Sequence, residues 1–193
     1  KMSDTTSVVL AGVGGQGILL ASEIVAQAAK ISGFDVKTNE VHGMAQRGGS
    51  VIAHVRFGEK VYSPLAAKGE AKVLGGLERI SALRYADYLC EGGLVAVNSQ
   101  MMVPVTVSMG MGEYPADAEK LLRDKFENLI YINASEEARK LGNVRAANVV
   151  LLGALSKGLD KLSEEAWLEA VKISVKPKFI DLNIKAFKTG REI

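Results

Sequence analysis

The chain has 193 residues, of which 48% are hydrophobic, and this proportion fits one large folded domain and excludes a disordered chain. Its 24 basic and 22 acidic residues give a formal net charge of +2 without a run of like charge, which argues against a surface built for nucleic acid or for an anionic membrane. The single cysteine, Cys90, excludes an intramolecular disulfide, and by itself it cannot hold an iron–sulfur cluster or a structural zinc ion.

The N-terminal part predicts a strand, a glycine turn and a helix, in that order. Residues 7–11 form a continuous apolar run, which is typical of a central parallel strand covered on both faces. Apolar residues recur at helical spacing over residues 18–29, and Ser32-Gly33 ends that helix. Residues 34–38 predict a second strand, so that these elements form a right-handed β-α-β unit.

A departure from regular α/β alternation follows the second strand. Residues 40–49 are polar and rich in glycine, and they predict an ordered loop. Residues 50–57 alternate as a strand does, and residues 58–60 predict a hairpin turn into a further strand at residues 61–63. An antiparallel hairpin at this place makes the predicted sheet mixed.

The rest of the chain returns to alternating strands and helices and ends in a helical part. The expected elements are a strand at 72–74, a helix at 78–89, a strand at 94–97, an irregular stretch at 101–115, a helix at 115–126, a strand at 129–132, a helix at 135–141, a buried helix at 149–155, and a helix between Ser163 and Pro177. We therefore predict a single domain over residues 1–193. Its fold is α/β: a three-layer α/β/α sandwich, Rossmann-like, with a mixed sheet, an inserted β-hairpin and a helical C-terminal part.

The first candidate site is the glycine turn between the first strand and the first helix. It satisfies the pattern G-x-G-x-x-G, with the candidate residues Gly12, Gly14, Gly15, Gln16 and Gly17. Glycines let the backbone approach a ligand closely, and the exposed N–H groups at the helix start attract an anion. Glu40, at the end of the second strand, stands where a ribose-binding acid is expected, so one interpretation is a dinucleotide site. The other is a structural turn, in which the Gln16 amide fixes a neighbouring loop.

The second candidate site is the loop over residues 41–50, which carries His, Gln and Arg side chains among glycines. Ordering such a loop is costly in entropy unless these side chains have partners. If the loop lies at the carboxyl end of the second strand, it stands beside the glycine turn, where open α/β sheets bind ligands or partners. Its candidate residues are His42, Gln46, Arg47, Gly48, Gly49 and Ser50.

Together the two motifs resemble the small subunit, or gamma domain, of 2-oxoacid:ferredoxin oxidoreductases. The family pattern is a Gly-x-Gly-Gly-Gln-Gly turn followed further along by an Arg-Gly-Gly element, and here these are residues 12–17 and 47–49. The fuller form over residues 40–51 resembles the indolepyruvate branch of the family. The likeness continues through residues 62–65 and 78–85, Asn98, and residues 141–143, 152–155 and 177–190. It therefore covers essentially the whole chain.

The resemblance implies an oxidative decarboxylation carried out by a hetero-oligomeric complex. An aryl 2-oxoacid and coenzyme A become an aryl-acetyl-CoA and carbon dioxide, and two electrons pass to ferredoxin. Thiamine diphosphate, Mg²⁺ and 4Fe–4S clusters are then expected on a larger partner subunit, with no cofactor and no catalytic residue on this chain. Coenzyme A and the 2-oxoacid are expected at a cleft that the two subunits share.

Several candidate residues have more than one interpretation. Arg47 either holds a carboxylate or phosphate bidentately, or forms a salt bridge to Glu40 or to the partner subunit. His42 either contacts substrate, coenzyme A or the partner, or is a loop histidine hydrogen-bonded to backbone. His54 alternates within a strand and is expected to be a surface or partly buried structural residue, and the two histidines do not by themselves make a metal site. Cys90, expected at a helix end, is interpreted as structural because a helix C-terminus disfavours a thiolate.

Three functional hypotheses follow from the sequence. The leading one is a subunit without cofactors that completes the active-site cleft of a larger thiamine enzyme. The second is a free-standing NAD(P)-dependent oxidoreductase that uses the glycine turn and Glu40, and the third is a coenzyme A- or phosphate-binding module that uses the turn with Arg47. No apolar stretch reaches the roughly 18 residues of a membrane span. No signal-peptide pattern is present, so we expect a cytoplasmic protein.

Overall fold

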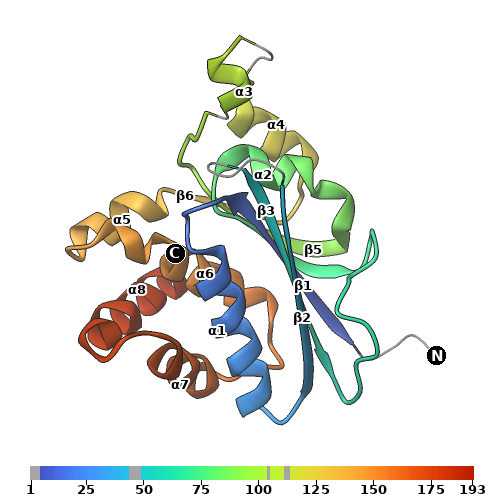
Figure 1. The fold of residues 1–193 in the computed structure, drawn as a ribbon, viewed down its shortest axis with the longest axis vertical. Helices are drawn as coiled ribbons and strands as arrows, with labels where there is room; N and C mark the ends of the chain where they lie inside the picture. The colour runs from blue at the N-terminus through green and yellow to red at the C-terminus, as the bar shows by residue number, and fades with distance from the viewer. Residues whose placement is uncertain (1–4, 44–48, 104, 111–113) are drawn as a thin grey trace.

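The computed structural model describes residues 5–43, 49–103, 105–110 and 114–193, which form one mixed sheet between two layers of helices (Figure 1). The strands lie side by side in the order β2-β3-β1-β4-β5-β6. They are β1 (Thr6–Val13), β2 (Asp35–His42), β3 (Ser50–Gly58), β4 (Ala71–Gly76), β5 (Leu89–Asn98) and β6 (Leu129–Ile132). Strand β3 runs antiparallel to β1 and β2, whereas β1, β4, β5 and β6 are parallel to one another. The predicted α/β architecture with a mixed sheet is confirmed.

Helices cover both faces of this sheet. They are α1 (Ile18–Ile31), α2 (Arg79–Arg84), α3 (Val105–Ser108), α4 (Ala118–Lys125), α5 (Ala134–Lys140), α6 (Ala147–Leu155), α7 (Glu164–Ser174) and α8 (Ile180–Glu192), with 3-10 turns at Ala86–Tyr88, Val144–Ala146, Ser156–Gly158 and Pro177–Phe179. One core cluster joins the sheet to α1, α5, α6, α7 and α8, and a second joins the other face to α2 and α4 (Figure 1). The C-terminal part is helical, as predicted.

Strand β1 lies in the interior of the sheet because its apolar side chains pack on both faces. Val8 and Leu10 belong to the core cluster on the α1 face, whereas Val9 belongs to the cluster on the α2 face. All three side chains are fully buried. Burial on both faces is what the continuous apolar run predicts for an interior strand.

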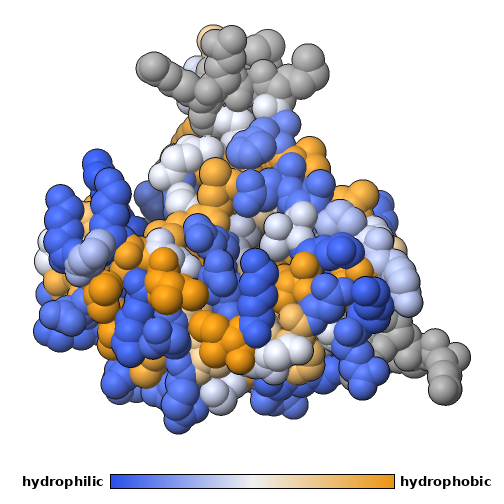
Figure 2. Space-filling view, turned by 60° about the horizontal axis from the view of Figure 1, so that its bottom comes forward, coloured by the Kyte–Doolittle hydropathy of each residue, from blue (hydrophilic) through white to orange (hydrophobic). Residues whose placement is uncertain are grey.

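The surface mixes charged and apolar residues. On the face shown in Figure 2, hydrophobic residues lie in patches between hydrophilic ones. Within the described part of the chain, no helix is long and apolar enough to cross a membrane.

The hairpin of the sheet is not the one predicted. Strands β2 and β3 form it, with Asp35 opposite Gly58, whereas residues 61–63 belong to no strand. Polar contacts hold that segment instead. The Val61 N–H donates to the Asp35 carboxylate at 2.9 Å, and the Arg56 guanidinium donates to the carbonyl oxygens of Ser63 and, just beyond the segment, Leu65. Strand β3 therefore lies between β1 and β2, inside the predicted β-α-β unit.

Two element boundaries also differ from the prediction for a tertiary reason. Residues 40–42 belong to β2 and not to a loop, because β2 pairs with β3 along its whole length. The helix predicted at 78–89 ends at Arg84, and a 3-10 turn follows it. Leu89 pairs with strand β4, so the chain leaves its helical path to join the sheet. Cys90 consequently lies in β5 and not at a helix end.

The stretch predicted to be irregular, residues 101–115, contains the short helix α3. Figure 1 shows α3 projecting from the body of the molecule beyond α4.

Candidate functional site

The glycine turn and the arginine-bearing loop, residues 43–49, meet at one edge of the sheet. The Gly14 N–H donates to the Gly49 carbonyl oxygen at 2.9 Å. Val13, the last residue of β1, pairs with Ser50, the first residue of β3. The contact arises because β3 is antiparallel to β1 and so begins where β1 ends. The prediction that the two motifs are neighbours is confirmed for the described residues. Three candidates of the loop lie outside those residues: Gln46, Arg47 and Gly48.

Gln16 cross-links the glycine turn to the next parallel strand. Its Oε1 accepts from the Val13 N–H at 2.8 Å, and its Nε2 donates to the Leu77 carbonyl oxygen, just after β4, at 3.0 Å. A Cβ at Gly12 would lie 2.7 Å from the Gln16 Oε1 and 3.0 Å from the Leu77 side chain. The glycine is therefore required for close packing, and the predicted role of the Gln16 amide in fixing a neighbouring segment is confirmed.

Gly17 begins α1 in a backbone conformation that favours glycine. Its φ is +78°, and its carbonyl oxygen accepts from Asn148 Nδ2 at 3.0 Å. A Cβ at this position would lie 2.5 Å from the same nitrogen, so strain and the neighbour both exclude a side chain. The first N–H groups of α1 have no acceptor within the helix, which gives this end of the helix a partial positive charge.

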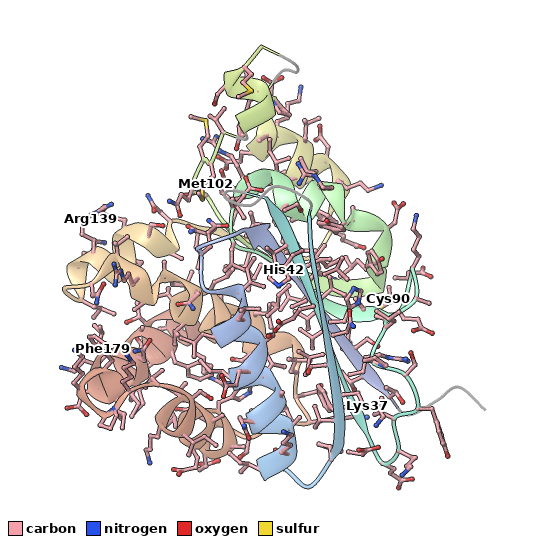
Figure 3. The ribbon with its side chains drawn as sticks, in the orientation of Figure 1. Lys37, His42, Cys90, Met102, Arg139 and Phe179 are labelled. Carbon is pink, nitrogen blue, oxygen red and sulfur yellow. The ribbon has the colours of Figure 1, made fainter. Side chains whose placement is uncertain are left out.

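A cleft of about 650 Å³ opens at the carboxyl ends of β1, β4 and β5. Its lining includes residues 14–17 of the glycine turn, Leu77, Asn98, Gln100, Arg145 and Asn148. Figure 3 labels Met102, which lines the cleft from the segment that follows β5. The helix after β1 and the helix after β4 lie on opposite faces of the sheet, so the connections change face at this point. Open α/β sheets bind their ligands at such points.

The floor of the cleft carries a network of buried amide and hydroxyl groups. Asn98, which is 3% exposed, donates from Nδ2 to the Leu77 carbonyl oxygen at 3.3 Å and to Ser135 Oγ at 3.1 Å. Ser135 Oγ in turn donates to Gln100 Oε1 at 3.1 Å. Asn98 Oδ1 is buried and has no hydrogen-bond partner in the described part of the chain. The cleft lining thus includes a buried acceptor whose hydrogen bond is unmade.

The electrostatic character of the cleft is positive. Arg145 belongs to the lining, and no carboxylate does among the residues that the structure describes. The amino-terminal end of α1 adds its partial positive charge. An anionic group is therefore favoured in this cleft.

Glu40 and His42 are on β2, and neither lines the cleft. Glu40 Oε1 accepts from the Ser22 hydroxyl of α1 at 3.0 Å. Because β3 separates β2 from β1, Glu40 is not on the strand next to the glycine turn, where a ribose-binding acid is placed in dinucleotide folds. His42 is exposed near the carboxyl end of β2 (Figure 3).

The possible metal-ligating side chains lie apart from one another in the described part of the chain. In the described ranges, no group of three or more His, Cys, Asp or Glu residues is placed to hold a metal ion. Cys90 is a free, partly buried thiol in β5, and His54 is buried within β3.

Sequence reasoning missed Arg145 and Asn148, which come from the other end of the chain. They lie in the 3-10 turn before α6 and in the first turn of α6. The signal that was available is a polar residue, Asn148, at the start of an otherwise apolar helix. Such a residue needs a partner when the helix is buried, and here the partner is the Gly17 carbonyl oxygen.

Comparison with known proteins points to one family. Residues 7–193 match the family model described as pyruvate ferredoxin/flavodoxin oxidoreductase. The chain is 46% identical over 188 residues to indolepyruvate oxidoreductase subunit IorB of Thermococcus kodakarensis, an alignment that covers 95% of this chain and 93% of the relative. It is 43% identical over 192 residues to the protein of the same name from Archaeoglobus fulgidus, with 95% and 92% covered. Among solved structures, the keto/oxoacid ferredoxin oxidoreductase gamma subunit from Geobacter sulfurreducens superposes with a TM-score of 0.72 at 28% identity, with 97% of this chain and 96% of that chain covered.

Proposed function

This chain belongs to the pyruvate ferredoxin/flavodoxin oxidoreductase family, and on that premise we propose that it is the small subunit of an enzyme that oxidises indolepyruvate or a related aryl 2-oxoacid. As a member of the family it is a subunit of a 2-oxoacid oxidoreductase. The enzyme would convert the 2-oxoacid and coenzyme A to an acyl-CoA and carbon dioxide, with ferredoxin as electron acceptor. The whole chain would act as one domain of this complex, in the cytoplasm.

The observation that carries the proposal is the meeting of the two motifs at the edge of an open cleft. The Gly14–Gly49 hydrogen bond joins them, and the cleft opens beside that contact. Among the described residues that line it, none is a serine, cysteine, histidine, lysine or carboxylate, so we assign these residues a role in binding and orientation. A surface of this kind completes a reaction site whose chemistry belongs to another polypeptide.

We propose that a larger partner subunit holds thiamine diphosphate, Mg²⁺ and the iron–sulfur clusters. A cubane cluster needs four thiolates in the usual case, and this chain has one cysteine. The donor set of the chain does not fit such a group, so its own contribution is to bind, orient and exclude water.

Coenzyme A is the ligand that we propose for the cleft, with the 2-oxoacid reaching the shared site from the partner. A phosphate group suits the amino-terminal end of α1 and the Arg145 guanidinium. A ligand N–H or O–H group suits the orphaned acceptor Asn98 Oδ1. The volume of about 650 Å³ is that of a small-molecule site. The glycine turn would line one side of the ligand.

Co-expression with the cysteine-rich large subunit tests the subunit assignment. We expect the two chains to purify together, and we expect ferredoxin reduction that requires both chains, coenzyme A and an aryl 2-oxoacid. Pyruvate and 2-oxoglutarate serve as substrate controls. Robust 2-oxoacid oxidation by this chain alone, or failure of the two chains to associate, would reject the proposal.

Removing Arg145, a cation of the cleft lining, tests the coenzyme A site. In the assembled enzyme, Arg145→Ala should raise the KM for coenzyme A by about tenfold, the size of one charge-assisted hydrogen bond, while kcat changes little. We expect the same result for Arg47→Ala, on the sequence motif alone. Arg139→Ala is the matched control, because Arg139 forms an ion pair with Glu136 on α5 and does not line the cleft (Figure 3). An unchanged KM in both test variants contradicts the assignment.

The free-standing NAD(P)-dependent oxidoreductase is less well supported. The Gly14 N–H is already bonded to Gly49, and the Glu40 carboxylate is bonded to Ser22. Titration of the isolated full chain with NADH distinguishes the two functions. Saturable binding below about 1 mM, a common ceiling for enzyme substrates, would favour the dinucleotide site.

A further inference from the structure

Helix α2 reaches the base of the arginine-bearing loop through one pair of hydroxyl groups. The Tyr85 hydroxyl lies 3.0 Å from Ser50 Oγ, and either oxygen is able to donate. Tyr85 is the C-terminal cap residue of α2, and Ser50 is the first residue of β3. The bond therefore ties a helix on one face of the sheet to the strand start beside the glycine turn.

Ser50 is the residue through which the base of the loop is fixed. Its carbonyl oxygen accepts from the Gly43 N–H at 2.7 Å, which closes the loop, and Ser50 pairs with Val13 at the end of β1. The preceding residue, Gly49, supplies the carbonyl oxygen that accepts from the Gly14 N–H. A displacement of Ser50 would therefore also move Gly49, the adjacent residue in the chain, and with it the acceptor of the Gly14 hydrogen bond.

Packing holds the Tyr85 ring in place independently of this hydrogen bond. The ring packs against the core cluster on the α2 face, with its centroid 6.3 Å from that of Tyr88. Tyr88 meets the buried His54 ring edge-on, with 5.3 Å between centroids. The start of α2 is fixed as well, because the buried Glu78 carboxylate accepts from the Ile80 N–H at 3.1 Å. A hydroxyl on a ring packed in this way loses little entropy when it bonds.

We propose that Tyr85 is a positioning residue, which holds the glycine turn in register with Gly49 at the end of the arginine-bearing loop by bonding to Ser50. It touches no ligand and acts through Ser50, Gly49 and Gly14. The inference rests on the proposed coenzyme A site, since the geometry that Tyr85 maintains is that of the cleft wall. Its loss would weaken coenzyme A binding and leave the chemical step largely unchanged.

The test uses the assembled enzyme and a pair of matched tyrosines. Tyr85→Phe should raise the KM for coenzyme A about fivefold, the size of one neutral hydrogen bond of about 1 kcal/mol, with kcat little changed. It should also speed amide hydrogen exchange in the peptide that contains Gly14. Tyr88→Phe, the same change on the neighbouring ring, should leave both readouts at their wild-type values.

A double-mutant cycle assigns the effect to the hydroxyl pair. Ser50→Ala should match Tyr85→Phe, and the double variant should be no worse than either single variant. Additive effects would overturn the proposal, because the two hydroxyls would then act separately. Unchanged exchange in the Gly14 peptide of Tyr85→Phe would overturn it too, even if the KM rises.

The failure of this inference is distinguishable from the failure of the coenzyme A assignment. The assignment is tested by Arg145→Ala, and the role of Tyr85 by the exchange of the glycine turn. An enzyme in which Arg145→Ala raises the KM while Tyr85→Phe changes neither readout keeps the coenzyme A site and loses the positioning residue.

Discussion

His54 shows what burial does to a single titratable residue in this fold. It is 3% exposed, its Nδ1 accepts from the Ala66 N–H at 3.4 Å, and its ring packs against Tyr88. Burial, and secondarily the charge of Arg56, lowers the pKa of His54 below the ordinary value of 6.5. The sequence-based expectation of a surface or partly buried residue was therefore wrong, because β3 lies between β1 and β2 and its side chains are covered.

This lowered pKa predicts a loss of stability in mild acid. Below pH 6.5 the unfolded chain binds a proton at His54 more readily than the folded chain does. The free energy of unfolding therefore decreases as the pH is lowered. The fall is at most about 1.4 kcal/mol for each pH unit until the folded pKa is reached. Urea denaturation at pH 7.5 and pH 5.5, chosen as about one unit on either side of 6.5, measures it.

The exposed histidine of the same hairpin supplies the control for that measurement. His54→Gln should flatten the pH dependence between the two conditions, because the titrating group is gone. His42→Gln, the same substitution at the exposed histidine of the hairpin, is the matched control. An equal effect of the two substitutions would show that His54 is not the group responsible.

The packing of α6 against α8 depends on two glycines that face each other. A Cβ at Gly153 would overlap the Phe187 carbonyl oxygen, and a Cβ at Gly190 would overlap the Val150 carbonyl oxygen. Both obstacles are backbone atoms, which cannot move aside as the end of a flexible side chain can. Close approach of the helices lets α6 stay buried between the sheet and α8, as its uniformly apolar sequence predicts.

Gly153→Ala is therefore expected to destabilise the protein, against the ordinary helix preference. In an open helix the change would stabilise by up to about 1 kcal/mol. Here overpacking should lower the free energy of unfolding by about 3 kcal/mol, as measured by urea denaturation. Lys185→Ala, on an exposed position of α8, should change it by less than about 0.5 kcal/mol. A stabilised Gly153→Ala variant would show that the helices are further apart.

At the scale of the whole molecule, local sequence patterns predicted individual helices and strands better than they predicted which strands pair with one another. The apolar run of β1, the glycine turn and α1 were predictable because each depends on adjacent residues. The hairpin was mispredicted because strand pairing depends on residues far apart in the sequence. Strands β2 and β3 pair on either side of the loop, and Val61, which is in no strand, donates its N–H to the Asp35 carboxylate. The end of α2 was mispredicted for the same reason, since Leu89 is drawn into the sheet by β4.

The sequence predicted the candidate-site residues that belong to the two motifs, but not those that other segments contribute. The glycine turn and the Gly49–Ser50 end of the loop are together, because both motifs flank strands that pair. Glu40 was placed by analogy with a parallel sheet, and the antiparallel β3 moved it one strand further away. Asn98, Arg145 and Asn148 reach the cleft from remote segments, and no local spacing in the sequence relates them to Gly17.

The reversed direction of β3 has a consequence for how this family diversifies. In an all-parallel sheet, every connection at the ligand edge leads into a helix that must repack if its length changes. The connection from β2 to β3 joins two strands that pair with each other, so no helix has to repack when its length changes. We therefore expect insertions or exchanges there to leave the helices and the parallel strands in their arrangement. Variation in substrate preference among relatives should accordingly concentrate in that one connection.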